Sequence, residues 1–372
     1  MPKRVDPEAL QQLFLRLLPI EGVALGERRI ADEIIGLLRQ NGIRVQEDDA
    51  GKRLQGNTGN LICLPPDFNP HEPALLLNAH LDTVQSTACL EPVADGDAVR
   101  TNGKTILGAD NRLGVAVLLH LLLTLARQGR AHKNFMVVFT VAEEIGMLGA
   151  TQLDLSRLNL KQAFVFDCSR RPGTYIRECV GSTIFQLTFV GKAAHSGVAP
   201  EEGINAIALA STALAQIKTG RIDTETTANL GKIHGGTAIN IVPDKVVVEG
   251  EVRSFSRRRI QEQIASIRDT AARAVNGIGA LHFESYDDFE PYGHAPDAPV
   301  VRALERALRA VALVPNPIRY MGGSDANIWN AKGLPAINLG IGAQKPHTVE
   351  EFVLIEDLIK TAEIAFALVE PD

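Results

Sequence analysis

The stretch 135-FMVVFTVAEEIG-146 gives the clearest indication of the fold class. Its first seven residues are typical of a strand that is buried on both faces of a parallel sheet. Two adjacent glutamates, Glu143 and Glu144, follow almost at once. Like charges rarely end a buried strand, so the pattern raises the question of what stabilises two carboxylates there.

The composition of the 372-residue chain is that of a globular protein, with 45% hydrophobic and 22% charged residues. The length predicts two domains, or one large domain with an insertion. A formal net charge of -6 argues against nucleic acid or an anionic membrane surface as a partner. Four scattered cysteines without a C-x-x-C pair indicate neither a zinc knuckle nor a disulfide framework, and they fit a reducing cytosol.

No segment indicates a secretory signal or a membrane span. Residues 1–22 place glutamines and an arginine within the apolar run, which predicts an amphipathic helix. The longest apolar stretch, 113–126, is too short to cross a bilayer and contains His120, so we expect a buried core helix. We therefore expect a soluble, cytoplasmic protein without a membrane partner.

Apolar strands alternate with helices in the first half of the chain and near its end. Strands are expected at 74–79, 135–141, 163–166 and 335–340, and a helix at 113–128. Continuous apolar strands separated by helices predict an α/β fold, with a mainly parallel sheet covered by helices on both faces.

The middle of the chain has a different pattern, in which apolar and polar residues alternate. Strands are expected at 182–190, 228–236, 244–254 and 280–286, and helices at 204–219 and 257–275. This β-α-β-β-α-β order is the split, ferredoxin-like arrangement. We expect residues 180–292 to be a small α+β domain inserted into a larger α/β domain, 1–179 and 293–372.

Histidines and acidic residues, which can bind metal ions or transfer protons, follow the expected parallel strands. In an open α/β sheet, ligands bind outside the carboxyl ends of the strands. If these strands are neighbours, one rim of the sheet collects His80, Asp82, Asp110, Glu143, Glu144, Asp167 and His347.

Carboxylates crowded on one rim repel each other and need compensating charge. Imidazoles together with carboxylates suit zinc, cobalt or manganese. Two divalent cations would balance Asp110, Glu144, Asp167 and a bridging hydroxide. One glutamate would then bind metal, while the other would serve as base for the attacking water. From these residues alone, which glutamate has which role stays open.

Each residue taken alone also fits an ordinary structural role. Asp110 or Asp167 could be a helix N-cap, and His80 could be a core or surface histidine. Glu143 and Glu144 could form the solvated first turn of a helix. The joint order and spacing favour the metal site over these alternatives.

The motifs resemble those of the M20 family of di-zinc metallopeptidases, in its peptidase T-like, tripeptide aminopeptidase-like branch. The core motifs are HLD at 80–82, GAD at 108–110, the EE pair, Asp167 and the late His347. The longer segments are LGADNRLGVA, VGKAAHSGVAPEEGINAI, GGTAINIVP and GGSDAN, so the resemblance covers nearly the whole chain.

The resemblance implies two metal ions per chain, expected to be zinc, with cobalt or manganese as alternatives. His80 and Asp167 would bind one ion, and Glu144 and His347 the other. Asp110 would bridge the two.

Two further residues of the cluster gain roles from the resemblance. Glu143 would be the general acid/base, working with a hydroxide that bridges the metals. Asp82 would orient His80, and its position two residues along the strand suits this role.

The inserted domain would form a homodimer and close over the site. His195 would help polarise the scissile carbonyl, and Asn240 would contact substrate. Arg253 would bind a substrate carboxylate through paired hydrogen bonds. Gly323 lies in the GGSDAN loop, which would face the substrate. Alternatively, His195 is a plain loop histidine and Arg253 a surface ion-pair residue.

The resemblance implies removal of the N-terminal residue from short peptides such as tripeptides, and a short peptide is the expected substrate. An N-acyl amino acid amidohydrolase or a glutamate-type carboxypeptidase would use the same metal site. A non-catalytic relative should have lost a ligand or the base, whereas all are present here. The chain is shorter than peptidase T proper and differs around EEIGMLGA, which leaves the substrate open.

Overall fold

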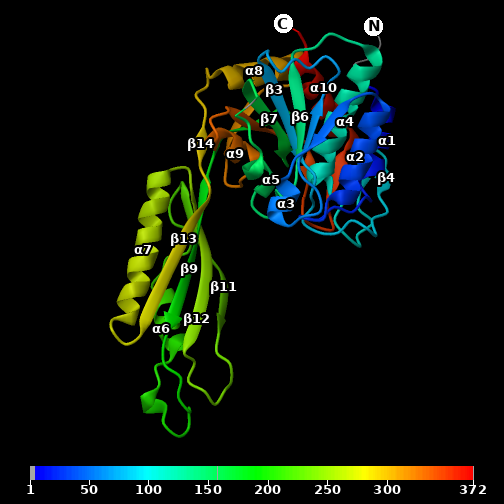
Figure 1. Cartoon of the computed structure of the whole chain (residues 1–372). Helices are drawn as coiled ribbons and strands as arrows, with labels where there is room; N and C mark the ends of the chain where they lie inside the picture. The colour runs from blue at the N-terminus through cyan, green and yellow to red at the C-terminus, as the bar shows by residue number, and fades with distance from the viewer. Residues whose placement is uncertain (1–4, 157, 372) are drawn as a thin grey trace. The chain divides into compact units, whose positions relative to one another are not determined.

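The computed structural model describes residues 5–156 and 158–371, and the chain divides into two compact units. The first unit comprises Met1–Arg177, Gly293–Arg319 and Ser324–Asp372. The second comprises Glu178–Tyr292 and Tyr320–Gly323. Figure 1 shows the elements of both. The exact limits of independently folding domains stay a prediction.

The first unit is built on a nine-stranded mixed sheet with the order β1-β2-β6-β3-β7-β16-β8-β14, and β15 pairs with β8. The strands are β1 (Arg44–Glu47), β2 (Leu61–Leu64), β3 (Ala74–His80), β6 (Phe135–Thr140), β7 (Leu160–Cys168), β8 (Thr174–Cys179), β14 (Tyr292–Gly293), β15 (Asn316–Tyr320) and β16 (Ala336–Gly340). The mainly parallel α/β sheet predicted from the sequence is confirmed, because β6, β3, β7 and β16 are parallel neighbours.

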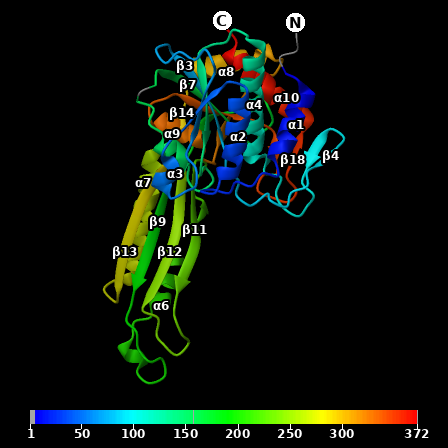
Figure 2. The ribbon, with the colours of Figure 1, turned by 45° about the vertical axis from the view of Figure 1, so that its right-hand side comes forward.

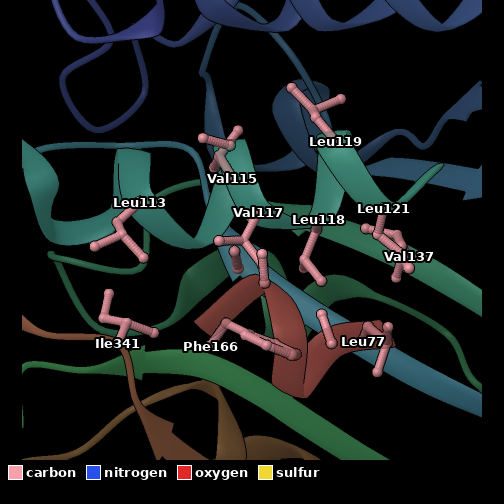
Figure 3. Packing of buried hydrophobic residues seen from close by; sticks show 14 of the residues in the cluster. Leu77, Leu113, Val115, Val117, Leu118, Leu119, Leu121, Val137, Phe166 and Ile341 are labelled. Atoms are coloured by element: carbon pink, nitrogen blue, oxygen red, sulfur yellow. The ribbon is translucent and has the colours of Figure 1, made fainter. Parts of the chain in front are cut away.

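Helices cover both faces of this sheet. They are α1 (Pro7–Leu17), α2 (Arg28–Gln40), α3 (Ala50–Leu54), α4 (Ala109–Gln128), α5 (Leu148–Gln152), α8 (Pro299–Ala310), α9 (Asp325–Ala331) and α10 (Ile355–Val369). Helix α4 packs on β3 and β7 and contacts α1, α2 and α10. In Figure 3, its apolar side chains lie against Leu77, Val137 and Phe166 of the sheet.

Helix α4 is long and apolar enough to span a membrane, but 83% of its most apolar window is buried inside the protein. The prediction of a core helix is therefore confirmed. The helix carries apolar residues on nearly all sides because the sheet, α1, α2 and α10 surround it.

A small antiparallel sheet, which the sequence analysis did not predict, lies in the same unit. Its strands, in order, are β17 (Ala343–Gln344), β18 (Phe352–Leu354), β5 (Ala98–Arg100) and β4 (Val93–Asp95). Residues 345–351 form the connection between β17 and β18. This connection carries His347, so the small sheet determines where that histidine lies.

The second unit is an antiparallel five-stranded sheet with two main helices, shown in Figure 2. In sheet order the strands are β10 (Gly220–Arg221), β11 (Thr226–Gly235), β12 (Lys245–Ser254), β9 (Gly181–Val190) and β13 (Ala280–Phe289). The helices are α6 (Ala206–Leu214) and α7 (Arg257–Val275), with a 3-10 turn at Pro200–Glu202. The predicted β-α-β-β-α-β order is confirmed.

The prediction of a helix over 204–219 is wrong at both ends, because α6 is shorter. At its start, the Asn205 side chain accepts the N–H groups of Ile207 and Ala208, which makes Asn205 the N-cap. At its end, the chain turns through residues 215–217 and reaches β10 at Gly220, whose φ of +79° breaks helical geometry.

Candidate active site

The carboxyl ends of four parallel strands bring the predicted cluster together in the first unit. His80 is the last residue of β3, and Asp167 lies at the end of β7. Glu143 and Glu144 lie in the turn that follows β6, and His347 follows β16 and β17. The rim expected from the sequence is therefore present, with side-chain atoms of His80, Asp110 and Glu144 within 4.8 Å of one another.

Asp110 lies between the two histidines and presents a different oxygen to each. Its Oδ1 is 3.2 Å from Nε2 of His80, and its Oδ2 is 3.4 Å from Nε2 of His347. Nε2 of His80 is also 3.4 Å from Oδ1 of Asp167, and Nε2 of His347 is 3.1 Å from Oε1 of Glu144. The five side chains thus form two groups that share Asp110.

Asp82 contacts the opposite edge of the His80 ring. Nδ1 of His80 lies 3.1 Å from the carbonyl oxygen of Asp82 and 3.4 Å from its Oδ1. Both neighbours are acceptors, which favours a proton on Nδ1 and directs Nε2 at Asp110 and Asp167.

Buried carboxylates also organise the turn that bears the glutamate pair. Oδ1 and Oδ2 of Asp82 accept the backbone N–H groups of Glu143 and Glu144, each at 3.0 Å. Oε1 of Glu27 accepts the N–H of Ala142, the preceding residue, at 2.8 Å. Three consecutive amides are therefore fixed by two buried acidic side chains, and Glu143 and Glu144 lie in a turn rather than in a solvated helix.

Two asparagines hold the Asp167 carboxylate. Nδ2 of Asn111 is 3.4 Å from its Oδ1, and Nδ2 of Asn338 is 3.3 Å from its Oδ2. Oδ1 of Asn111 accepts the N–H of Gly114 at 3.1 Å, so Asn111 rather than Asp110 caps the regular part of α4. A Cβ at Gly114 would come within 2.4 Å of the Phe166 carbonyl oxygen, so glycine permits this close approach of helix and strand.

The carboxylates raise the pKa of both histidines. Burial alone would lower the pKa of His80, but hydrogen bonds to Asp110, Asp167 and Asp82 outweigh it and raise the pKa well above its usual value. Hydrogen bonds to Asp110 and Glu144 raise the pKa of His347 to about 10. Protons on the imidazoles therefore offset part of the negative charge of the site.

The carboxyl groups respond differently to this crowding. Burial raises the pKa of Glu143 well above its usual value, and the charges of Asp167, Asp325 and Glu144 add to the effect. Burial also raises the pKa of Glu144 and of Asp167. Burial would also raise the pKa of Asp110, but hydrogen bonds from His347 and His80 outweigh burial and lower this pKa.

The donor set fits two divalent cations. Two imidazole nitrogens and three carboxylates converge, and nitrogen and oxygen ligands of this kind suit zinc, cobalt or manganese. Asp110 is placed to bridge, since each of its oxygens faces a separate histidine. Cations at these positions would replace the imidazole protons and relieve the repulsion between carboxylates.

A buried polar network that was not predicted from the sequence lies beside the cluster. Thr140 Oγ1 donates to Oδ2 of Asp325 at 2.5 Å and lies 3.2 Å from Nδ2 of Asn78. Nε1 of Trp329 donates to Oδ1 of Asn78 at 3.2 Å. Burial and nearby charges raise the pKa of Asp325 to about 7. The available signal was Asn78, a polar residue inside the apolar run that ends at His80.

The four predicted substrate-binding residues belong to the second unit. His195 and Asn240 lie close together there, because the N–H of Ser196 donates to the Asn240 carbonyl oxygen at 3.0 Å. Both residues are exposed, and Nδ1 of His195 accepts the N–H of Gly197 at 3.2 Å. Their contact with substrate stays a prediction.

Arg253 and Gly323 both lie at the Phe289 ring. The guanidinium of Arg253 is 5.8 Å from the ring centroid, and a Cβ at Gly323 would come within 2.6 Å of the ring. Nε and Nη2 of Arg253 donate to Oε2 of Glu251, each at 3.0 Å. This contact matches the ion-pair alternative, and binding of a substrate carboxylate would have to compete with Glu251.

Comparisons with known proteins agree with this architecture. The M20 peptidase dimerisation domain matches residues 179–276, and peptidase family M28 matches residues 60–169. The chain is 31% identical to the aminopeptidase PepT of Bacillus cereus, covers 99% of both chains and superposes with a TM-score of 0.88. The chain belongs to the M20 family of peptidases. Its similarity to PepT makes it a peptidase T-like M20 protein.

Two further relatives of this M20 peptidase cover almost the entire chain. A tripeptidase from Staphylococcus aureus is 31% identical, with 99% of both chains covered and a TM-score of 0.91. The uncharacterized protein YqjE of Bacillus subtilis is 32% identical over 369 residues, which is 98% of this chain and 99% of that one. Both units of this M20 peptidase therefore have counterparts in these proteins.

Proposed function

We propose that this M20 peptidase is a two-metal aminopeptidase that releases the N-terminal residue from short peptides, in particular tripeptides. One observation carries the proposal: the two oxygens of Asp110 face Nε2 atoms of two different histidines. A carboxylate in this position can bridge two cations, each of which would complete its ligand set from one side.

His80 and Asp167 would hold one ion, and His347 and Glu144 the other. We propose zinc as the metal, with cobalt or manganese as alternatives of similar ligand preference. When bound, such ions lower the pKa of water to about 7 and polarise a carbonyl oxygen. Asp82 would keep His80 in the tautomer that leaves Nε2 free for metal.

Glu143 would act as the general acid/base. Its backbone N–H is anchored to Asp82, and its side chain is not needed as a ligand in the two groups described above. The carboxylate would accept a proton from the attacking water and deliver it to the leaving nitrogen. The buried surroundings that raise its pKa favour the protonated state needed for the second step.

The substrate class is supported by the relatives. The two solved structures at 31% identity are an aminopeptidase and a tripeptidase. We propose that His195, Asn240, Arg253 and Gly323 contact the peptide, with His195 polarising the scissile carbonyl. The match of residues 179–276 to a dimerisation domain supports a homodimer through the second unit. We also propose a cytoplasmic location.

The test is a panel of tripeptides, free and N-acetylated, incubated with the zinc-, cobalt- and manganese-loaded protein. Mass spectrometry identifies the residue released. We expect release of the N-terminal residue from free tripeptides and none from the acetylated set, because an aminopeptidase recognises a free α-amine.

Release of a C-terminal residue would instead indicate a carboxypeptidase, and release of acetate an N-acyl amino acid amidohydrolase. No hydrolysis by any metal-loaded form would contradict the enzyme assignment. Light scattering on the same samples should give the mass of a dimer, and a monomer of 40.1 kDa would contradict the homodimer.

A further inference from the structure

Glu351 is a buried acidic side chain that none of the roles above uses. It is 1% exposed and lies at the end of the 345–351 connection, directly before β18. Its Oε2 accepts the N–H of Gly108 at 2.8 Å, and its Oε1 accepts the N–H of Asp110 at 3.2 Å. Both partners belong to the turn that carries the proposed bridging ligand.

The same connection contacts Asp110 at a second point. Nε2 of His347, four residues before Glu351, faces Oδ2 of Asp110 at 3.4 Å. His347 therefore meets the side chain of Asp110, while Glu351 holds its backbone. Gly108 is the N-cap of α4, and the first N–H groups of a helix have no acceptor within the helix, so an external acceptor is needed to fix these amides.

The small sheet places Glu351 for this contact. Pairing of β18 with β5 puts Phe352 opposite Arg100, and the N–H of Thr101 donates to the Glu351 carbonyl oxygen at 3.4 Å. The N–H of Glu351 donates to the Thr348 carbonyl oxygen at 3.2 Å, which closes the connection around His347. The backbone at Glu351 is thus fixed on both sides.

We propose that Glu351 is a positioning residue that holds the Gly108–Asp110 turn, so that the Asp110 carboxylate faces both histidines. The 345–351 connection then supplies one metal ligand and also aligns another. The inference rests on the proposed function in one respect, since it takes Asp110 and His347 as metal ligands. Residues that orient metal ligands typically alter metal affinity by about 10- to 100-fold when they are replaced.

The test compares Glu351→Gln with Glu350→Gln. The control makes the same chemical change one residue away, on an exposed side chain whose Oε2 bonds Lys345 at 2.9 Å. The amide at position 351 offers one acceptor oxygen, and its NH₂ group would face a backbone N–H. Two readouts are taken: Co²⁺ titration followed by visible absorption and metal content, and hydrogen exchange of peptides covering 107–111 in the metal-free protein.

We expect Glu351→Gln to bind Co²⁺ about 10- to 100-fold more weakly than the wild type, with an altered cobalt spectrum and faster exchange at 107–111. Glu350→Gln should match the wild type in both readouts. Wild-type affinity, spectrum and exchange in Glu351→Gln would overturn the inference.

A second variant covers the case in which Glu351→Gln does not fold. Glu351→Asp keeps the charge but is one methylene shorter, so it should lose contact with at least one amide and bind Co²⁺ more weakly. Wild-type binding and exchange by this variant would also overturn the inference. Failure of the wild type to bind two Co²⁺ ions would contradict the proposed function instead, and hydrogen exchange would still decide whether Glu351 holds the turn.

Discussion

At the scale of single residues, the glutamate pair has two different environments. Oε1 of Glu144 lies 3.1 Å from Nε2 of His347, which places it among the proposed ligands. Glu143 is fixed through its backbone by Asp82, and its carboxyl group experiences burial and surrounding negative charge. The residues alone left the roles of the two glutamates open, and the M20 resemblance implied Glu143 as the base. The neighbours of each side chain support that proposal.

The first prediction concerns this difference. Glu143→Gln should retain two metal ions per chain but lower kcat by about 10²- to 10⁴-fold, because general acid–base catalysis is lost. Glu144→Gln should lose metal as well as activity. Metal analysis and steady-state kinetics on both variants distinguish the two roles. Near-normal kcat in Glu143→Gln would remove it as the base.

The second prediction concerns Asp110. Asp110→Asn keeps the size of the side chain but removes the charge that faces both histidines. We expect a metal content below two ions per chain after gel filtration, since an amide bridges two cations poorly. A content of two ions, bound with wild-type affinity, would contradict the bridging role.

At the scale of elements, α1 and α4 share a buried histidine. His120 lies on α4, is 5% exposed, and its Nε2 accepts the N–H of Asp6 at the start of α1 at a distance of 3.4 Å. Burial lowers the pKa of His120 to about 4. The contact between these helices therefore depends on an uncharged imidazole.

The third prediction follows from this pKa. In the unfolded chain a histidine titrates near a pKa of about 6.5, so between pH 6.5 and 4 the unfolded state binds more protons. Stability therefore falls as pH falls through this window, by up to about 3 kcal/mol, and the contribution is constant below pH 4. His120→Gln, which keeps an acceptor, should lose less stability between pH 7 and pH 4.

Denaturant unfolding at both pH values measures this effect. His71→Gln is the control, because His71 is exposed. An equal loss of stability on acidification in the wild type and in His120→Gln would contradict the prediction.

How much of the fold could be predicted from the sequence depends on the kind of element. The parallel strands were predictable because burial on both faces leaves a continuous apolar run, as at 135–140. The small sheet was not, since strands of two or three residues carry no periodic signal. The contacts of Asp325 with Thr140 and of Glu351 with Asp110 join residues 185 and 241 positions apart, and no local pattern reports them.

At the scale of the whole molecule, the candidate site concentrates negative charge inside the first unit. Protons on His80 and His347 offset this charge only in part, because three carboxylates face two imidazoles. Cations bound there would be linked to folding, since an unfolded chain does not preserve the ligand arrangement. Stability of the molecule should therefore depend on metal.

The fourth prediction is that removal of metal by a chelator lowers the Tm and that added zinc or cobalt restores it. A site at 100-fold excess of free metal over its Kd contributes about 2.7 kcal/mol. The effect should weaken as the pH falls, since protons compete with metal for the imidazoles. Calorimetry with and without metal measures it, and an unchanged Tm would contradict the metal site.

The main segment of the second unit begins and ends at neighbouring points of the chain. Its first and last long strands pair with each other, with Ser182 opposite Phe289, so the chain leaves and returns at adjacent points. A segment with such neighbouring ends can be exchanged, because a short linker can span the gap between its ends without stretching the remaining chain. The length of this segment can therefore vary while the candidate metal-binding rim of the first unit keeps its sequence.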